Sequence, residues 1–86
     1  MPESMDLRIT MYTTSWCGDC RRLKAELHRA GVSFREIDIE QEQSAAEFVK
    51  RVNDGNLSVP TLVFSDGSTM TEPSSRSVIQ RLAELA

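Results

Sequence analysis

Cys17 and Cys20 are the only cysteines of this 86-residue chain, and they lie in the stretch TTSWCGDCRRLK, residues 13–24. Such a C-x-x-C pair can be a structural disulfide, part of a metal site or a redox couple. A disulfide across so short a loop removes little entropy from the unfolded chain, which argues against a structural role. Structural zinc takes four ligands. The one histidine, His28, is more simply a surface residue, so a metal or cluster site would require a second chain.

A redox role fits the position of the pair beside a strand–helix–strand pattern. Cys17 is expected at the start of a helix, where unpaired N–H groups and the helix dipole favour an anion. The thiolate is the form of cysteine that attacks disulfides. Cys20 would lie one turn further along, less exposed and placed to resolve a mixed disulfide. Gly18 allows a substrate to approach the backbone beside the attacking sulfur.

The neighbours of the pair modify this chemistry. Asp19 opposes formation of a thiolate at Cys17, whereas Arg21 and Arg22 favour it, so we expect moderate activation of the sulfur. Trp16 precedes the attacking residue. Its flat ring predicts a substrate platform, with an exposed aromatic residue capping the sheet as the alternative.

Hydrophobic periodicity predicts the elements that position these residues. Asp66–Gly67 is a strong hairpin signal. The first two strands should be parallel, joined by a right-handed crossover. The second strand changes apolar phase between Phe34 and Ile37, so we expect it to be buried on both faces or bulged.

The last helix should bury a stripe of Val78, Ile79, Leu82 and Leu85. The predicted elements are a strand over 7–12, a helix over 17–30, a strand over 32–40, a helix over 42–56, strands over 61–64 and 68–71, and a helix that opens at Pro73.

Composition bounds the function class. The chain is 27% charged and 40% hydrophobic with a net charge of −3, which is ordinary for a soluble globular protein. We therefore expect a single domain over residues 1–86, with residues 1–6 as a flexible polar lead. The acidic balance argues against nucleic-acid binding, and no apolar run is long enough to span a membrane. No secretion signal is evident, so we expect a cytoplasmic protein, in a compartment where thiols are kept reduced.

Four stretches together resemble the glutaredoxin branch of the thioredoxin superfamily, and within it the actinobacterial mycoredoxin group. They are YTTSWCGDCRRLK, FREIDIE, SVPTLVF and DGSTMTEPS. The resemblance covers nearly the whole chain. It implies an α/β fold of βαβαββα order, with a four-stranded mixed sheet flanked by three helices.

The resemblance also implies an activity. Mycoredoxins reduce mixed disulfides between proteins and mycothiol, a cysteine-containing pseudo-disaccharide. Cys17 would attack the mixed disulfide, and Cys20 would resolve it through a Cys17–Cys20 disulfide when that path is used. In the family the proline at Pro60 is cis, and the preceding residue, here Val59, pairs its backbone with the substrate. The partners implied are thiolated client proteins and a small thiol, with a flavin disulfide reductase upstream as an option. No bound cofactor or metal is implied, and we expect a monomer.

The chain departs from glutathione-using glutaredoxins in three places. It has C-G-D-C in place of C-P-Y-C, Thr14 in place of a lysine, and TEPSS, residues 71–75, in place of a Gly-Gly pair and acidic residues. The hydroxyls of Thr71, Ser74 and Ser75 could hydrogen-bond a sugar-like thiol, or they could simply cap the last helix. Mycothiol is therefore favoured over glutathione as the reductant. Asp19 stands where mycoredoxins have tyrosine, so the resemblance does not predict the substrate contacts on that side of Cys17 or the redox potential.

Two other functions compete with this interpretation. The first is a thioredoxin-like or ribonucleotide-reductase-coupled redoxin that a flavoprotein reduces, since WCG.C also resembles thioredoxin. The second is a dimer that holds an iron–sulfur cluster through Cys17 and two small thiols. Cluster-carrying relatives typically show C-G-F-S, so Cys20 argues against the cluster.

Overall fold

The computed structural model describes residues 8–86, and its elements follow the order expected from the sequence. The expectations for residues 1–6 and for Leu7 lie outside the described residues. The elements are β1 (Ile9–Thr13), α1 (Gly18–Arg29), β2 (Arg35–Asp38), α2 (Gln43–Val52), β3 (Thr61–Phe64), β4 (Thr69–Thr71) and α3 (Ser75–Leu85).

The strands form one mixed sheet in the order β2-β1-β3-β4. β2 runs parallel to β1, and β3 runs antiparallel to both β1 and β4. The β3–β4 hairpin turns where the Asp66–Gly67 signal predicts it. Gly67 has a φ of 91°, a conformation that glycine adopts without steric cost, and the Ser68 N–H donates to the Asp66 carboxylate at 3.0 Å.

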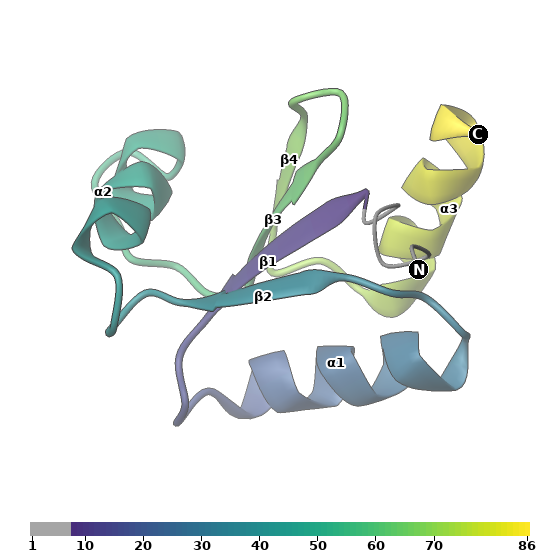
Figure 1. The fold of residues 1–86 in the computed structure, drawn as a ribbon, viewed down its shortest axis with the longest axis horizontal. Coiled ribbons are helices and arrows are strands. Elements are labelled where there is room, and N and C mark those ends of the chain that lie inside the picture. The colour runs from purple at the N-terminus through teal and green to yellow at the C-terminus, as the bar shows by residue number, and fades with distance from the viewer. Residues whose placement is uncertain (1–7) are drawn as a thin grey trace, which may run out of the picture.

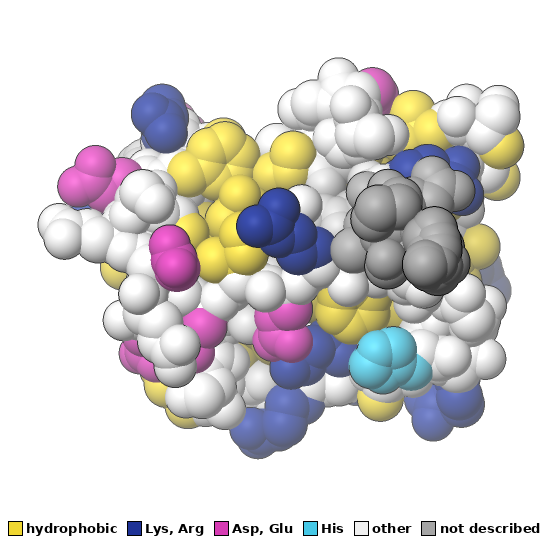
Figure 2. Space-filling view, viewed as in Figure 1, with side chains coloured by type: hydrophobic (Ala, Val, Ile, Leu, Met, Phe, Trp, Pro, Cys, Tyr) yellow, Lys and Arg dark blue, Asp and Glu magenta, His cyan; other side chains and the backbone are white. Residues whose placement is uncertain are grey.

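Helices cover both faces of this sheet, so the protein has two hydrophobic clusters. α1 and α3 pack together on one face, and α2 lies on the other (Figure 1). In Figure 2, hydrophobic side chains that are only partly buried against the cluster under α2 reach the surface beside this helix. The larger cluster consists of Ile9, Met11, Leu23, Leu27, Leu62, Phe64 and Val78. The smaller consists of Ile39, Ala45 and Val49, with partly buried Tyr12, Ile37, Ala46, Phe48 and Val59 against it.

The second strand differs from its prediction. β2 pairs only with β1, and as an edge strand it leaves Arg35 and Glu36 exposed. The phase change has another cause: Phe34 packs against the larger cluster, whereas Ile37 packs against the smaller one. The apolar residues therefore serve both faces, but the strand is neither bulged nor buried.

The stripe on the last helix is also narrower than predicted. Val78 is fully buried and Leu82 and Leu85 are half-buried against the larger cluster, but Ile79 remains 40% exposed. Within residues 8–86, the model contains no helix with the length and hydropathy that crossing a bilayer requires.

Candidate active site

Cys17 occupies the N-cap of α1, directly after the loop that leaves β1. Its φ and ψ of −83° and 112° are extended, as a cap requires, and its carbonyl accepts the Arg21 N–H at 3.2 Å. Its sulfur takes the place of a capping oxygen and accepts the Cys20 N–H at 3.0 Å. The predicted helix-start position is confirmed.

Cys20 has a different environment on the same turn. It is fully buried, whereas Cys17 keeps 5% of its surface exposed, and both cysteines are unbonded thiols. Burial, followed by the hydrogen bond with Cys17, raises the pKa of Cys20 to about 12. At neutral pH, Cys20 is therefore a protonated thiol, buried behind the sulfur of Cys17.

The Val59–Pro60 segment lies beside Cys17. The peptide bond is cis, as the sequence resemblance implied. The Cys17 sulfur lies 3.8 Å from the Val59 carbonyl oxygen. The Pro60 carbonyl accepts the Glu72 N–H at 2.7 Å, so the loop after β4 is tied to this segment. Two stretches distant in sequence thus frame the sulfur.

The sulfur opens onto a shallow depression of about 460 Å³, here called the cysteine groove. Trp16 and Leu57 are the large apolar side chains that line it, 67% and 50% exposed. The Trp16 indole N–H donates to the Glu40 carboxylate at 2.8 Å, which fixes the ring beside Cys17. The complete lining is Trp16, Cys17, Gly18, Asp19, Leu57, Ser58, Val59 and Glu72.

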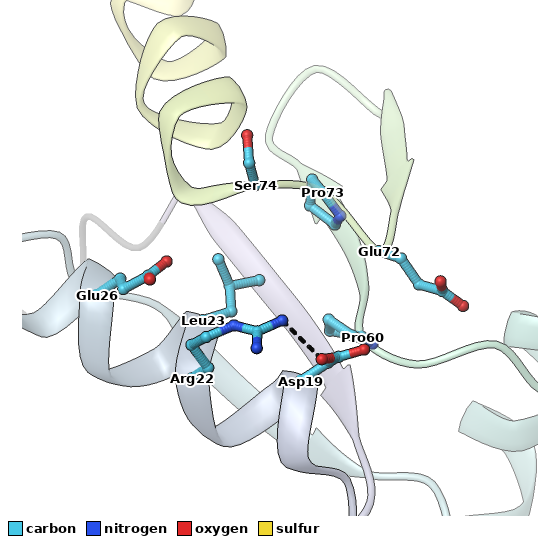
Figure 3. A pocket seen from close by; sticks show the side chains of 8 residues that line it. All are labelled: Asp19, Arg22, Leu23, Glu26, Pro60, Glu72, Pro73 and Ser74. Carbon is cyan, nitrogen blue, oxygen red and sulfur yellow. Dashed lines mark hydrogen bonds and ion pairs between the residues drawn. The ribbon is translucent and has the colours of Figure 1, made fainter.

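A second cavity of about 290 Å³, the α1–α3 pocket, lies between the first turns of α1 and the start of α3 (Figure 3). Asp19 and Glu72 line both cavities, so the two are neighbours around Pro60. The Arg22 guanidinium is turned toward Asp19 at 2.7 Å. The complete lining is Asp19, Arg22, Leu23, Glu26, Pro60, Glu72, Pro73 and Ser74.

The three hydroxyl residues expected at the substrate lie in different places in the structure. Thr71 donates to the Asn53 side-chain oxygen at 2.6 Å, toward the end of α2, and lines neither cavity. Ser75 begins α3 and also lines neither. Ser74 lines the α1–α3 pocket, but its hydroxyl caps α3 by accepting the Ser77 N–H at 3.1 Å. Thr71 and Ser75 thus lie outside the linings of these two cavities, and their predicted contact with substrate stays a prediction.

Glu72 is the residue of this junction that the sequence interpretation missed. It borders both cavities and has a φ of 52°, in the left-handed region that few residues other than glycine adopt. The signal available in the sequence was its position inside TEPSS, where glutathione-using glutaredoxins have the Gly-Gly pair.

Glu36 was also missed, because nothing in its sequence context marks it. Its carboxylate accepts from the Thr13 hydroxyl at 2.7 Å and from the Lys24 ammonium at 2.8 Å, and so connects β2 to β1 and α1. Burial opposes the charged form, but hydrogen bonds from Lys24 and Thr13 outweigh it and lower the pKa of Glu36. The bridge holds the helix that carries both cysteines against the sheet.

Metal ligation has little support among the described residues. Residues 8–86 bring together no group of at least three histidine, cysteine, aspartate or glutamate side chains that could hold an ion. The chemistry that this arrangement can perform is thiol–disulfide exchange at Cys17.

Comparison with known proteins points to one family. The glutaredoxin family model matches residues 9–68. A Mycobacterium tuberculosis protein named as a glutaredoxin is 51% identical over 78 residues, which cover 91% of this chain and 93% of that protein. Mycoredoxin 1 of Corynebacterium glutamicum is 44% identical over 78 residues, covering 91% of this chain and 96% of that protein.

Solved structures agree with the sequence relatives. The glutaredoxin of Methanosarcina mazei superposes with a TM-score of 0.74 at 26% identity, covering 88% of this chain and 78% of that one. Methanoredoxin of Methanosarcina acetivorans gives a TM-score of 0.71 at 25% identity, covering 86% and 82%. The mixed sheet flanked by three helices is therefore the thioredoxin-like fold that the sequence predicted.

Proposed function

Because the chain belongs to the glutaredoxin family, and is a disulfide oxidoreductase of that type, we propose that it reduces mixed disulfides between client proteins and mycothiol. The observation that carries the proposal is the position of the Cys17 sulfur. It caps α1, accepts the Cys20 N–H at 3.0 Å, and borders the cysteine groove next to the Val59 carbonyl.

The proposed reaction has two exchange steps. The Cys17 thiolate attacks the mycothiol sulfur of the mixed disulfide, and the client leaves as a thiolate that takes a proton. A second mycothiol then attacks the new Cys17–mycothiol disulfide. Cys17 is released as a thiolate, and the two mycothiols leave joined by a disulfide. The net result is that the client–mycothiol disulfide is exchanged for a mycothiol disulfide. The client sulfur ends as a thiol, the incoming mycothiol thiol is oxidised into the new disulfide, and the proton it gives up balances the one that the client takes.

Val59 and Trp16 are the proposed substrate contacts beside the sulfur. Val59 would offer backbone groups to the cysteinyl part of mycothiol, and the exposed face of Trp16 would cover it. Gly18 leaves room for this approach, because apart from its chain neighbours and the backbone of its own helix no described atom lies within 4 Å of where its Cβ would stand. The sugar part would extend past Pro60 toward the α1–α3 pocket.

Two features favour mycothiol over glutathione. The chain is 44% identical to Mycoredoxin 1 over most of both proteins. The β4–α3 junction also carries TEPSS, residues 71–75, in place of the Gly-Gly pair and acidic residues of glutathione-using relatives. Because thiols must stay reduced for this cycle, we place it in the cytoplasm, and we propose that a monomer performs it with a flavin disulfide reductase regenerating mycothiol.

A coupled assay tests the proposal. The purified protein is given a client protein carrying a mycothiol mixed disulfide, and NADPH consumption is followed with mycothiol plus mycothiol disulfide reductase, glutathione plus glutathione reductase, or thioredoxin reductase. We expect turnover in the mycothiol arm. Turnover only with thioredoxin reductase would instead establish the thioredoxin-like alternative. A brown, dimeric protein as purified would support the iron–sulfur alternative.

A further inference from the structure

The walls of the two cavities carry an excess of negative charge. Asp19, Glu26 and Glu72 line one or both cavities, and Arg22 is the cation among the lining residues. Arg22 is already engaged, because its guanidinium contacts the Asp19 carboxylate at 2.7 Å. In Figure 3 the Glu72 carboxylate points away from both of these side chains. Within residues 8–86, no ion pair of 4 Å or less compensates Glu72.

Glu72 also has a fixed position relative to the reacting sulfur. It borders the cysteine groove, and its backbone N–H donates to the Pro60 carbonyl at 2.7 Å. Pro60 follows the residue whose carbonyl is 3.8 Å from the Cys17 sulfur. Glu26 lines only the α1–α3 pocket, away from the lining that includes Cys17. Among residues 8–86, Glu72 is therefore a carboxylate without an ion-pair partner that borders the groove containing the Cys17 sulfur.

We propose that Glu72 determines specificity by charge, disfavouring small disulfides that carry carboxylates near the sulfur relative to neutral or cationic ones. The inference rests on the proposed exchange chemistry at Cys17. Like charges repel a substrate before and during attack, and the repulsion weakens with added salt. Glutathione carries two carboxylates and one ammonium, whereas a sugar-based thiol without carboxylates is neutral. Glu72 thus favours the neutral class of small thiol.

The test measures the reaction of reduced Cys17 with three simple disulfides that differ in charge. The probes are bis(2-hydroxyethyl) disulfide, which is neutral, 3,3′-dithiodipropionate, which is anionic, and cystamine, which is cationic. Samples are quenched with acid, and free Cys17 is counted by alkylation and mass spectrometry. Each rate constant is divided by that for the neutral probe, and the ratio is compared between wild type and variant, so that intrinsic reactivity cancels.

At low ionic strength, Glu72→Gln should raise the relative rate of the anionic probe by about threefold and lower that of the cationic probe by about the same factor, as expected for one exposed charge acting through water. Glu72→Lys should shift both ratios further in the same directions. Both effects should shrink at about 0.5 M salt. If Glu72 had only a structural role, its replacement would change the relative rates of the anionic and cationic probes in the same direction.

Glu47→Gln is the matched control, because it makes the same charge change on the exposed surface of α2. Its ratios should equal those of wild type. If Glu72→Gln leaves both ratios unchanged, or shifts them in the same direction, the inference is wrong while the exchange chemistry stands. If wild-type Cys17 reacts with none of the three probes, the proposed function itself fails and the inference falls with it.

Discussion

The first turn of α1 and the junction between β4 and α3 face each other across Pro60, but they are built differently. The turn places its reacting groups with the backbone of one helix, because the Cys20 N–H reaches the Cys17 sulfur at 3.0 Å within four residues. The junction is held from elsewhere: the Glu72 N–H reaches back to Pro60, and Thr71 reaches across to Asn53. The groups proposed to perform the exchange are thus local in sequence, whereas the surface proposed to recognise the substrate is assembled from distant segments.

This difference assigns separate roles to the two regions. Changes in the turn should alter whether exchange happens at all, and changes in the junction should alter which disulfides are preferred. The same assay can compare variants of the two regions. If both kinds of variant changed the exchange rate and the preference among disulfides alike, the two regions would not have separate roles.

The largest effect is expected from Cys17→Ser. A hydroxyl in that position is not ionised at neutral pH and does not exchange with disulfides, so turnover should fall by about 10³-fold or more. The coupled assay with a mycothiol mixed disulfide measures the loss, and circular dichroism checks that the fold is kept. Residual turnover near the wild-type rate would show that another group attacks the disulfide.

The next effect is a contrast between the two cysteines in wild type. Because burial and the hydrogen bond with Cys17 raise the pKa of Cys20 to about 12, almost all of Cys20 is a protonated thiol at pH 7.5. Iodoacetamide should therefore label Cys17 and leave Cys20 unlabelled. A raised pKa delays ionisation, so Cys20 labelling in the folded protein should increase about tenfold per pH unit above neutral and level off only near pH 12. Peptide mass spectrometry after a short pulse gives both rates, and equal labelling at pH 7.5 would contradict the assigned roles.

A smaller effect is expected from Cys20→Ser on mixed disulfides. The group that donates to the Cys17 sulfur is the backbone N–H of residue 20, which serine retains. The rate with a mycothiol mixed disulfide should stay within about threefold of wild type, since a single thiol suffices for that exchange. Reduction of disulfides within a protein, which needs the second thiol, should be lost. Loss of both activities would make the dithiol route obligatory.

The sequence predicted the turn better than the junction for a physical reason. Cysteine spacing and helical periodicity lie within one short stretch, so Cys17 at the cap and Cys20 behind it could be derived from the residues themselves. The element order and the hairpin turn followed from patterns of similar range. The edge position of β2 could not be derived, because the change of apolar phase at Phe34 and Ile37 does not show which strands flank it.

The junction depended on contacts that no local pattern encodes. Thr71 and Ser75 have side chains suited to a sugar, but the direction of each is set by neighbours from other elements. The Asn53 side-chain oxygen accepts a hydrogen bond from the Thr71 hydroxyl, and Ser75, at the start of α3, lies outside both cavities. The left-handed backbone at Glu72 accompanies its N–H bond to the Pro60 carbonyl, and residue type indicates neither of them.

The smallest effects on exchange should come from Thr71→Val and Ser75→Ala. Neither side chain lines the cysteine groove or the α1–α3 pocket, so rates with all three probe disulfides should match wild type within about twofold, even though Glu72 lies between them in the same junction. Thr71→Val removes the 2.6 Å bond to Asn53, so it should lower the free energy of unfolding by about 1 kcal/mol, measured by urea titration. A variant that keeps its stability but slows the neutral probe would place its hydroxyl at the substrate after all, and would return the junction to the role first predicted from its sequence.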